Sequence, residues 1–453
     1  MTASSDSLRS QAIAAARAAA ERRGQGGSIG HDPAERAMVP TPRFEDLPDY
    51  RDLHRMQQAA ALIGVENPYF RLHDGHAADT TLIHGVKVLN FASYDYLGLN
   101  ADPRVTGAAK DAIDRYGVSP SGSRLVAGCR PVHDELEAAL ARHYDTAAAM
   151  VFVSGHSTNV STIGHLMREG DLILYDSLCH NSIQVGMRLS GAARRSYAHN
   201  DMAALETLLA ENRHRYRHAL IVTEGLFSMD GDIPPLSDLV ALKRRYGCWL
   251  MVDEAHALGT VGASGAGSFQ ATAVAPGDID IWMGTLSKTL AATGGYIAGS
   301  RALIDLLKGH ASGYVYSVAL APALAAAALA ALSLMAAEPD RVARLQDNSA
   351  RFLAAAAATG LDTGGAQRHG IVPVLIDESL LAAKLSERLL ARGLNVLPVM
   401  FPAVPMQAAR LRFFLSALHR PDQIDHAVRT TSEELARLRA EGFGHALPPG
   451  LMP

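Results

Sequence analysis

The chain has 453 residues, of which 48% are hydrophobic and 19% charged, so it can bury the core of a large enzyme-sized body. The formal net charge of −4 excludes a bulk electrostatic attraction to nucleic acid or to an anionic membrane. Three cysteines, Cys129, Cys179 and Cys248, lie far apart and form no metal-ligand pattern, so we expect reduced thiols, a cytoplasmic protein and no bound metal.

The N-terminal residues 1–43 read as an arm outside the main body. An Ala- and Arg-rich stretch at residues 7–23 predicts a helix, and residues 24–42 carry the Gly, Pro and charge of a linker. The arm is predicted to be flexible, or to dock an acidic partner such as an acyl carrier protein. We divide the rest into a leading segment at 44–100, a large domain at 101–335 and a small C-terminal domain at 336–453. No apolar run reaches about 18 residues, so no transmembrane helix is predicted.

A strand, a glycine turn and a helix follow one another at residues 147–160. The buried strand at 147–153 runs into the sequence SGHSTNV. Such a turn presents free backbone N–H groups and the positive end of a helix dipole to an anion. Gly155, His156 and Ser157 are therefore candidates for binding a phosphate group.

Two further buried strands present an acid and a lysine. The strand at 249–252 is followed by Asp253 and His256, and the strand at 279–283 by Thr285, Ser287 and Lys288. A pyridoxal phosphate (PLP) enzyme needs a lysine that forms a Schiff base with the cofactor aldehyde and an acid that keeps the pyridine nitrogen protonated. The pair predicts PLP as the cofactor.

The segments D-E-A-H and T-L-S-K, in this order, resemble those of the fold-type I PLP enzymes and, within them, of the α-oxoamine synthases. This family joins an amino acid to an acyl thioester with loss of CO2. The resemblance covers residues 45–435 and includes the segments NFASYDYLGLN and GSRLVAGCRPVHDELE. It implies an α/β fold with a mostly parallel sheet in the large domain, an α+β small domain, and a homodimer with shared active sites.

The resemblance also assigns roles around the cofactor. It implies that Asp253 pairs with the pyridine nitrogen and that Lys288 is the Schiff-base lysine. His180 would stack on the pyridine ring, and His256 would approach its 3′-oxygen side, so we predict Lys288, His180 and His256 as catalytic residues. The remaining cofactor contacts implied are Gly155, His156, Ser157, Ser228, Thr285, Ser287 and, from the partner subunit, Ser317. Ala319 stands where several relatives carry a hydroxyl, which weakens the case for Ser317.

Three residues are predicted to bind substrates by the same resemblance. Arg412, in R-L-R-F-F, would hold the α-carboxylate of the amino acid, which suits a guanidinium fork. Tyr94 stands where serine palmitoyltransferases have Tyr and most 8-amino-7-oxononanoate synthases have Asn. Met400 stands where the latter place an Arg that meets the far carboxylate of a pimeloyl chain, which favours an uncharged acyl chain.

We therefore predict a PLP-dependent acyltransferase, most like serine palmitoyltransferase, that condenses serine, glycine or alanine with an acyl-CoA or acyl carrier protein. It would serve sphingolipid or secondary metabolite biosynthesis, with peripheral membrane association if the acyl chain is long. The alternatives are 8-amino-7-oxononanoate synthase or 2-amino-3-ketobutyrate ligase activity, a fold-type I aminotransferase, a module acting on carrier-bound chains, and a non-catalytic subunit, which the presence of Lys288 disfavours.

Overall fold

The computed structural model describes residues 41–443 except 63, 402 and 406. The predicted helix at 7–23 and most of the predicted linker lie outside the described residues. The chain forms two compact units, residues 1–58 and 59–453. The described part begins with a short 3-10 helix, Phe44–Asp46, and helix α2, Pro48–Leu62. The predicted domain boundaries at 43, 100 and 335 stay predictions.

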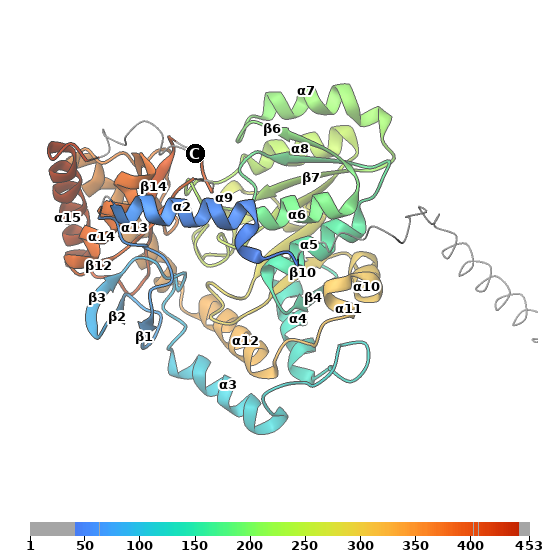
Figure 1. Ribbon diagram of the computed structural model, residues 1–453. Coiled ribbons are helices and arrows are strands. Elements are labelled where there is room, and N and C mark those ends of the chain that lie inside the picture. The colour runs from blue at the N-terminus through green and yellow to red at the C-terminus, as the bar shows by residue number, and fades with distance from the viewer. Residues whose placement is uncertain (1–40, 63, 402, 406, 444–453) are drawn as a thin grey trace, which may run out of the picture. The chain divides into compact units, whose positions relative to one another are not determined.

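A seven-stranded sheet forms the centre of the large domain (Figure 1). Its strand order is β4-β10-β9-β8-β7-β5-β6. Only β10 is antiparallel to its neighbours, so the predicted mostly parallel α/β sheet is confirmed. In that order the strands span Ala148–Phe152, Gly295–Gly299, Ile281–Thr285, Trp249–Asp253, Ala219–Glu224, Leu172–Asp176 and Ala193–Tyr197.

Alternating residues of each strand fill two separate cores, one on each face of this sheet, because successive side chains of a strand point to opposite faces. In β8, Met251 packs in one cluster, whereas Leu250 and Val252 pack in the other. Helices α5 (Gly155–Leu166), α6 (Asn181–Ser190), α10 (Arg301–His310) and α11 (Ser312–Val315) cover the first face. Helices α4 (Pro131–His143), α7 (Met202–Asn212), α8 (Leu236–Tyr246) and α12 (Pro322–Ala337) cover the second.

The small domain contains the antiparallel sheet β11-β14-β13, built from Ile371–Asp377, Ala409–Phe414 and Leu397–Val399. Its helices are α13 (Asp340–Thr359), α14 (Ser379–Ala391) and α15 (Pro421–Ala440). A second sheet, β1-β2-β3-β12, contains the hairpin Thr80–Ile83 and Val86–Asn90, flanked by His73–Asp74 and Leu394–Asn395. The remaining described helices are α3 (Pro103–Tyr116) and α9 (Ser268–Thr272), with 3-10 turns at Arg213–Arg215 and Pro276–Asp278.

Two stretches of the C-terminal half are interrupted. Residues 394–399 contribute to two sheets, as β12 and β13. The Ala-rich helix α12 ends at Ala337, and Pro339 precedes the first turn of α13. Among the described residues, no single helix combines the length and hydropathy required to cross a bilayer; α12 and α13 reach them only together, bent by 78°.

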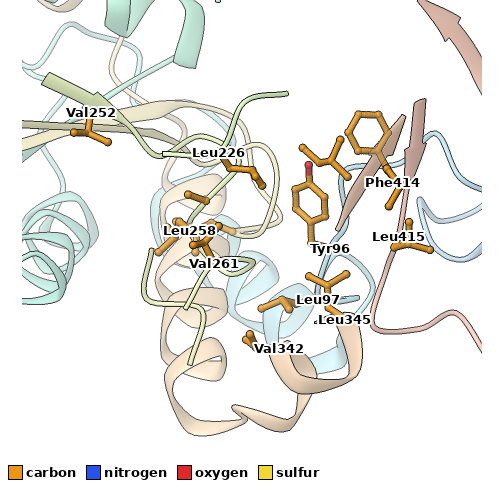
Figure 2. Close-up of a cluster of buried hydrophobic side chains, with 14 of the residues drawn as sticks. Tyr96, Leu97, Leu226, Val252, Leu258, Val261, Val342, Leu345, Phe414 and Leu415 are labelled. Atoms are coloured by element: carbon orange, nitrogen blue, oxygen red, sulfur yellow. The ribbon is translucent and has the colours of Figure 1, made fainter. Parts of the chain in front are cut away.

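A buried apolar cluster joins the loop after β8 to the small domain (Figure 2). Leu258 and Val261 come from that loop, and Val342 and Leu345 come from α13. Tyr96 and Leu97 lie in the same cluster beside Phe414 and Leu415 at the end of β14. Because the loop also carries His256, this packing fixes the position of a predicted site residue relative to the small domain.

Candidate active site

A cavity opens at the carboxyl ends of the parallel strands, where loops leave the sheet and ligands bind in open α/β folds. It gathers residues from five separate stretches of the chain. Its lining residues are Ser154, Gly155, His156, Asn159, His180, Ser182, Glu224, Asp253, Ala255, His256, Met283, Thr285, Ser287, Lys288, Thr293 and Gly294. Eight of the predicted site residues therefore lie in one cavity: Gly155, His156, His180, Asp253, His256, Thr285, Ser287 and Lys288.

Lys288 follows β9 and reaches into this cavity. Its Nζ lies 5.6 Å from the centre of the Tyr94 ring. Burial lowers the pKa of Lys288 to about 8, with Arg412 acting in the same direction and Asp253 and Glu224 opposing it. A lysine with a lowered pKa holds a sizeable fraction of neutral amine near pH 7–8, which is the form that attacks an aldehyde or accepts a proton.

Asp253 and Glu224 form a buried carboxyl pair because they are register partners at the ends of β8 and β7. Asp253 accepts hydrogen bonds from Asn159 Nδ2 at 2.8 Å and from the backbone N–H of Ala255 at 2.9 Å. Glu224 accepts one from the backbone N–H of His180 at 2.6 Å. Burial and the neighbouring Asp253 raise the pKa of Glu224 well above its usual range. Asp253 is the carboxyl group of the pair that is held by two donors.

The predicted anion cradle lies at the N-terminus of α5. Ser154 is the N-cap, and its side chain accepts from the backbone N–H of Ser157. The first N–H groups of a helix have no intrahelical acceptor, so those of Gly155 and His156 are available to a ligand. A Cβ on Gly155 would come within 2.8 Å of Thr285 Oγ1, so only glycine allows this close approach. Thr285 Oγ1 in turn lies 2.7 Å from Ser287 Oγ.

Two histidines line the cavity. His180 is the N-cap of α6, and its Nδ1 lies 2.7 Å from Ser182 Oγ. His256 Nδ1 lies 2.7 Å from the hydroxyl of Tyr96. Burial lowers the pKa of His180 and lowers that of His256 well below its usual range, with Lys288 adding to both. Both imidazoles are therefore neutral at pH 7 and act as hydrogen-bonding groups rather than as cations.

An aromatic wall connects the cavity to the small domain. The rings of Tyr94 and Phe414 meet edge to face at 4.7 Å, and the Arg412 guanidinium lies 4.7 Å from the Phe414 ring centre. Arg412 Nη1 donates to the backbone carbonyl of Ser228 at 3.0 Å. Its buried Nε has no hydrogen-bond partner among the described residues. A guanidinium that is oriented but not satisfied is suited to a carboxylate ligand.

Six predicted site residues lie outside the cavity lining, among them Arg412, which is described above. Ser157 is in the first turn of α5, where its hydroxyl donates to the backbone carbonyl of Ser154. Ser228 is buried beside Arg412, while Ser317 and Met400 are half-buried in loops after α11 and β13. Tyr94 lies at the cavity mouth, 40% exposed. Their predicted roles stay predictions.

Sequence reasoning gave no cofactor role to several residues that line the cavity, chiefly Asn159 and Glu224. The signal for Glu224 was available, because it ends the strand before β8 just as Asp253 ends β8. Asn159 lies one turn into α5, and only the packing of α5 on the sheet brings it to Asp253. Asn159 Oδ1 is buried without a partner among the described residues.

These residues fit PLP. The first turn of α5 with Thr285 offers donors for a phosphate, and Asp253 offers a buried, oriented carboxylate for a pyridine N–H. Lys288 lines the same cavity with an amine whose pKa is lowered to about 8. Among the described residues, no group of three or more His, Cys, Asp or Glu side chains is arranged to hold a metal ion. The three cysteines are free thiols.

Comparison with known proteins agrees with this geometry. The aminotransferase class I and II family matches residues 86–430. An 8-amino-7-oxononanoate synthase of Methylobacterium nodulans is 46% identical over 349 residues, which cover 77% of this chain and 87% of that protein. The 8-amino-7-oxononanoate synthase 1 of Bacillus subtilis is 35% identical over 396 residues, 87% of this chain and 97% of that one. Among solved structures, a Sphingomonas wittichii serine palmitoyltransferase superposes with a TM-score of 0.83 at 30% identity, covering 88% of this chain and 99% of that chain.

The chain therefore belongs to the aminotransferase class I and II family and, within it, to the PLP-dependent α-oxoamine synthases. This confirms the predicted family, the fold-type I fold, the cofactor and the acyltransferase class. The predicted preference for a serine palmitoyltransferase reaction is corrected. Relatives named 8-amino-7-oxononanoate synthase, at 35–46% identity, support the predicted alternative better than the serine palmitoyltransferase reading.

Proposed function

We propose that the chain condenses a small amino acid with an acyl thioester in the manner of 8-amino-7-oxononanoate synthase. In this reaction the α-carbon of the amino acid forms a bond to the acyl carbon. The thiol leaves, the carboxylate is lost as CO2, and a proton replaces it on the α-carbon of the α-aminoketone product. The observation that carries the proposal is the 46% identity to a protein of that name over three quarters of this chain.

When bound, PLP supplies a reactive aldehyde and a protonated ring that withdraws electrons from the α-carbon of the substrate. Asp253 would hold the proton on the ring nitrogen, because its carboxylate is buried and fixed by Asn159 and by the Ala255 N–H. Gly155, His156 and Thr285 would hold the phosphate. His180 and His256, both neutral, would orient the ring without adding positive charge to it.

Lys288 and Arg412 would handle the amino acid. Arg412 would bind the α-carboxylate with its free donors while Ser228 keeps the guanidinium in place. Lys288 would remove the proton from the α-carbon, a step suited to an amine whose pKa is about 8. Tyr94, against Lys288 and Phe414, would close the pocket on the side of the amino acid and limit the access of water.

A second candidate is the serine palmitoyltransferase type of reaction, favoured by two residues. Tyr94 stands where those enzymes carry Tyr, and Met400 offers no positive charge to the far end of a dicarboxylic chain. The TM-score of 0.83 to the serine palmitoyltransferase structures agrees with this, against 0.67 for an 8-amino-7-oxononanoate synthase of Francisella tularensis at 27% identity, which covers 78% of this chain and 99% of that one.

A homodimer is part of the proposal. The loop at residues 117–130 and the segment at 316–318 adjoin, because the Ala319 N–H donates to the Gly122 carbonyl at 3.0 Å. Both carry exposed apolar side chains. The exposed fractions range from 52% to 87% for Val118, Leu125, Val126, Tyr316 and Val318. A contiguous exposed apolar surface of this kind is typical of an interface, and Ser317 lies within it.

The testing experiment is a spectral titration of the PLP-loaded protein with alanine, serine, glycine and threonine. We expect alanine to change the absorbance of the bound cofactor at the lowest concentration. The saturating amino acid is then combined with pimeloyl and palmitoyl thioesters, each on CoA and on a carrier protein, and CO2 release is measured. Serine with a palmitoyl thioester as the preferred pair would favour the second candidate. Conversion of a keto acid without CO2 release would contradict both and indicate an aminotransferase.

A further inference from the structure

His199 lies between two carboxylates outside the cavity. It follows β6, and its Nδ1 is 3.0 Å from Asp176 Oδ1 while its Nε2 is 2.9 Å from Asp232 Oδ2. An imidazole that faces a carboxylate with each nitrogen donates from both and is therefore a cation. Burial alone would lower the pKa of His199, but the hydrogen bonds to Asp176 and Asp232 outweigh it and raise the pKa to about 10.

The Asp176 end of this bridge belongs to the turn that carries His180. Asp176 is the last residue of β5 and is fully buried. Its carboxylate also accepts from the backbone N–H groups of Leu178 at 2.9 Å and Asn200 at 2.8 Å. The turn then leads to His180 at the start of α6. His199 thus fixes the base of the turn from which a cavity residue projects.

The Asp232 end belongs to the loop at residues 225–233, which is closed by a hydrogen bond from the Phe227 N–H to the Asp232 carbonyl at 2.9 Å. This loop contacts β14 of the small domain. Its Ser228 carbonyl accepts from Arg412 Nη1, and its Asp230 forms an ion pair with Arg410 at 2.7 Å. The edge-to-face contact of Phe227 with the His199 ring, at 4.5 Å, adds to the bridge.

We propose that His199 is a positioning residue for the amino-acid site. It holds the 225–233 loop, which orients Arg412, against the turn that carries His180. Asp176 and Asp232 face His199 from two separate elements, and Asn200 Nδ2 also donates to Asp232 at 3.1 Å. Without the cation, the two carboxylates repel each other across the space it leaves. The loop then moves outward and the guanidinium loses its backbone acceptor. The inference rests on the proposed role of Arg412 as the carboxylate ligand.

The test compares His199→Gln with His218→Gln in the PLP-loaded protein. His218 is a matched control, because it is also half-buried but lies at the start of β7, at the end of the strand away from Glu224. There its ring stacks on Trp249 at 5.1 Å. Amide hydrogen exchange of residues 225–233 measures the loop directly. Titration with the amino acid and steady-state kinetics with the acyl thioester measure the two substrates separately.

For His199→Gln we expect faster exchange in the loop and an amino-acid dissociation constant raised about 5- to 10-fold, with the thioester KM changed less than about 2-fold. His218→Gln should match the wild type in all three. Unchanged exchange in His199→Gln would overturn the proposal, as would an equal loss of both substrates. Faster exchange with unchanged amino-acid affinity would support the role of His199 in holding the loop and contradict the role of Arg412 as the carboxylate ligand. Failure of the His199 proposal and failure of the proposed Arg412 role are therefore distinguishable.

The double variant His199→Gln/Asp232→Asn tests the route of the effect. Asp232→Asn removes one of the two opposed charges, so we expect the second substitution to cost little in the His199→Gln background and to restore part of the loop protection. Additive losses from the two substitutions would show that His199 does not act through Asp232. If His199→Gln alone loses PLP, Asp232→Asn alone probes the same loop with His199 still in place.

Discussion

Lys288 is the proposed attachment point of the cofactor, and it is the only amine that lines the cavity among the described residues. Lys288→Ala should abolish covalent attachment of the cofactor and lower turnover by at least about 10²–10⁴-fold, since it removes both the attachment point and the base. Borohydride reduction followed by peptide mass mapping is the measurement. Arg412 is retained in this variant and serves as a check on folding through amino-acid binding. A reducible adduct that persists in Lys288→Ala would show that another lysine holds the cofactor.

The lowered pKa of Lys288 predicts how the cofactor-free protein captures PLP. Burial places this pKa at about 8, whereas a lysine in an unfolded chain titrates at about 10.4. The neutral amine therefore accumulates as the pH rises through 8, and the capture rate should increase up to that point and level off above it. Stopped-flow absorbance between pH 6.5 and 10 measures the midpoint. A midpoint above 10 would mean that Lys288 is solvated in the folded chain.

The lowered pKa of Lys288 also makes the stability of the cofactor-free protein depend on pH. Between about pH 8 and 10.4 the unfolded chain holds a proton on Lys288 that the folded chain does not hold. The contribution of Lys288 to the free energy of unfolding of the cofactor-free protein therefore rises with pH across this window and is unfavourable below it. Lys288→Met should remove that part of the pH dependence, which denaturant unfolding at pH 7.5 and 9.5 measures.

Arg412 provides a prediction about substrate rather than cofactor. Arg412→Ala removes charge-assisted hydrogen bonds to a carboxylate, so the amino-acid dissociation constant should rise about 10- to 100-fold while the thioester KM changes little. Arg351→Ala is the control in the same domain, where the arginine on α13 is paired with Asp425 and does not contact the 225–233 loop. An equal effect of Arg412→Ala on both substrates would contradict its assignment as the carboxylate ligand.

At the scale of elements, the contact between β10 and α5 leaves no room for a side chain. A Cβ on Gly295 would lie 2.7 Å from Gly155 Cα and 2.5 Å from Thr158 Oγ1, so the first turn of α5 would have to move. Gly295→Ala should therefore destabilise the fold by about 1–3 kcal/mol and accelerate PLP loss. Thermal unfolding and cofactor release during dialysis measure the two effects.

Gly107 in helix α3 supplies the matched control for this substitution. A Cβ there meets nothing within 4 Å, and the residue lies inside a helix. Gly107→Ala should therefore stabilise the protein by roughly 0.5–1 kcal/mol through the helix propensity of alanine. Equal effects of the two glycine substitutions would mean that the approach of α5 to β10 is not what Gly295 provides.

At the scale of the whole molecule, the exposed apolar surface around Val126 and Tyr316 predicts a second copy of the chain. The double variant Val126→Asp/Tyr316→Asp should dissociate the assembly and lower turnover, because the neighbouring Ser317 would no longer reach a partner subunit. Sedimentation velocity measures the molecular mass. The double variant Phe70→Asp/Leu72→Asp, which charges two other exposed apolar residues, should leave the mass unchanged. A wild-type monomer with full activity would contradict the shared site.

The N-terminal arm gives a further prediction at this scale. Deleting residues 1–40 should leave PLP binding intact, because the described residues that line the cavity all lie between Ser154 and Gly294. If the arm docks a carrier protein, the deletion should raise the KM for the carrier-bound acyl chain and leave the KM for the acyl-CoA unchanged. If the deletion leaves the KM for the carrier-bound acyl chain unchanged, the docking role is contradicted.

The sequence by itself determined the local elements and the chemistry of the strand ends. The strands before Asp253 and Lys288 could be predicted because buried parallel strands are short apolar runs. An acid and a lysine after such strands, within segments that resemble those of fold-type I PLP enzymes, were enough to predict the cofactor.

Only the tertiary structure decided which distant residues meet. Three of these contacts join residues that are distant in the sequence: Asn159 with Asp253, Tyr94 with Lys288, and His199 with Asp176 and Asp232. The separations range from 23 positions, for Asp176 and His199, to 194 positions, for Tyr94 and Lys288. A local pattern carries no information about such pairs, because they depend on strand order and on the packing of helices against the sheet. For the same reason the lowered pKa of Lys288 could not be predicted, since it arises from burial and from Arg412, which a separate domain brings close.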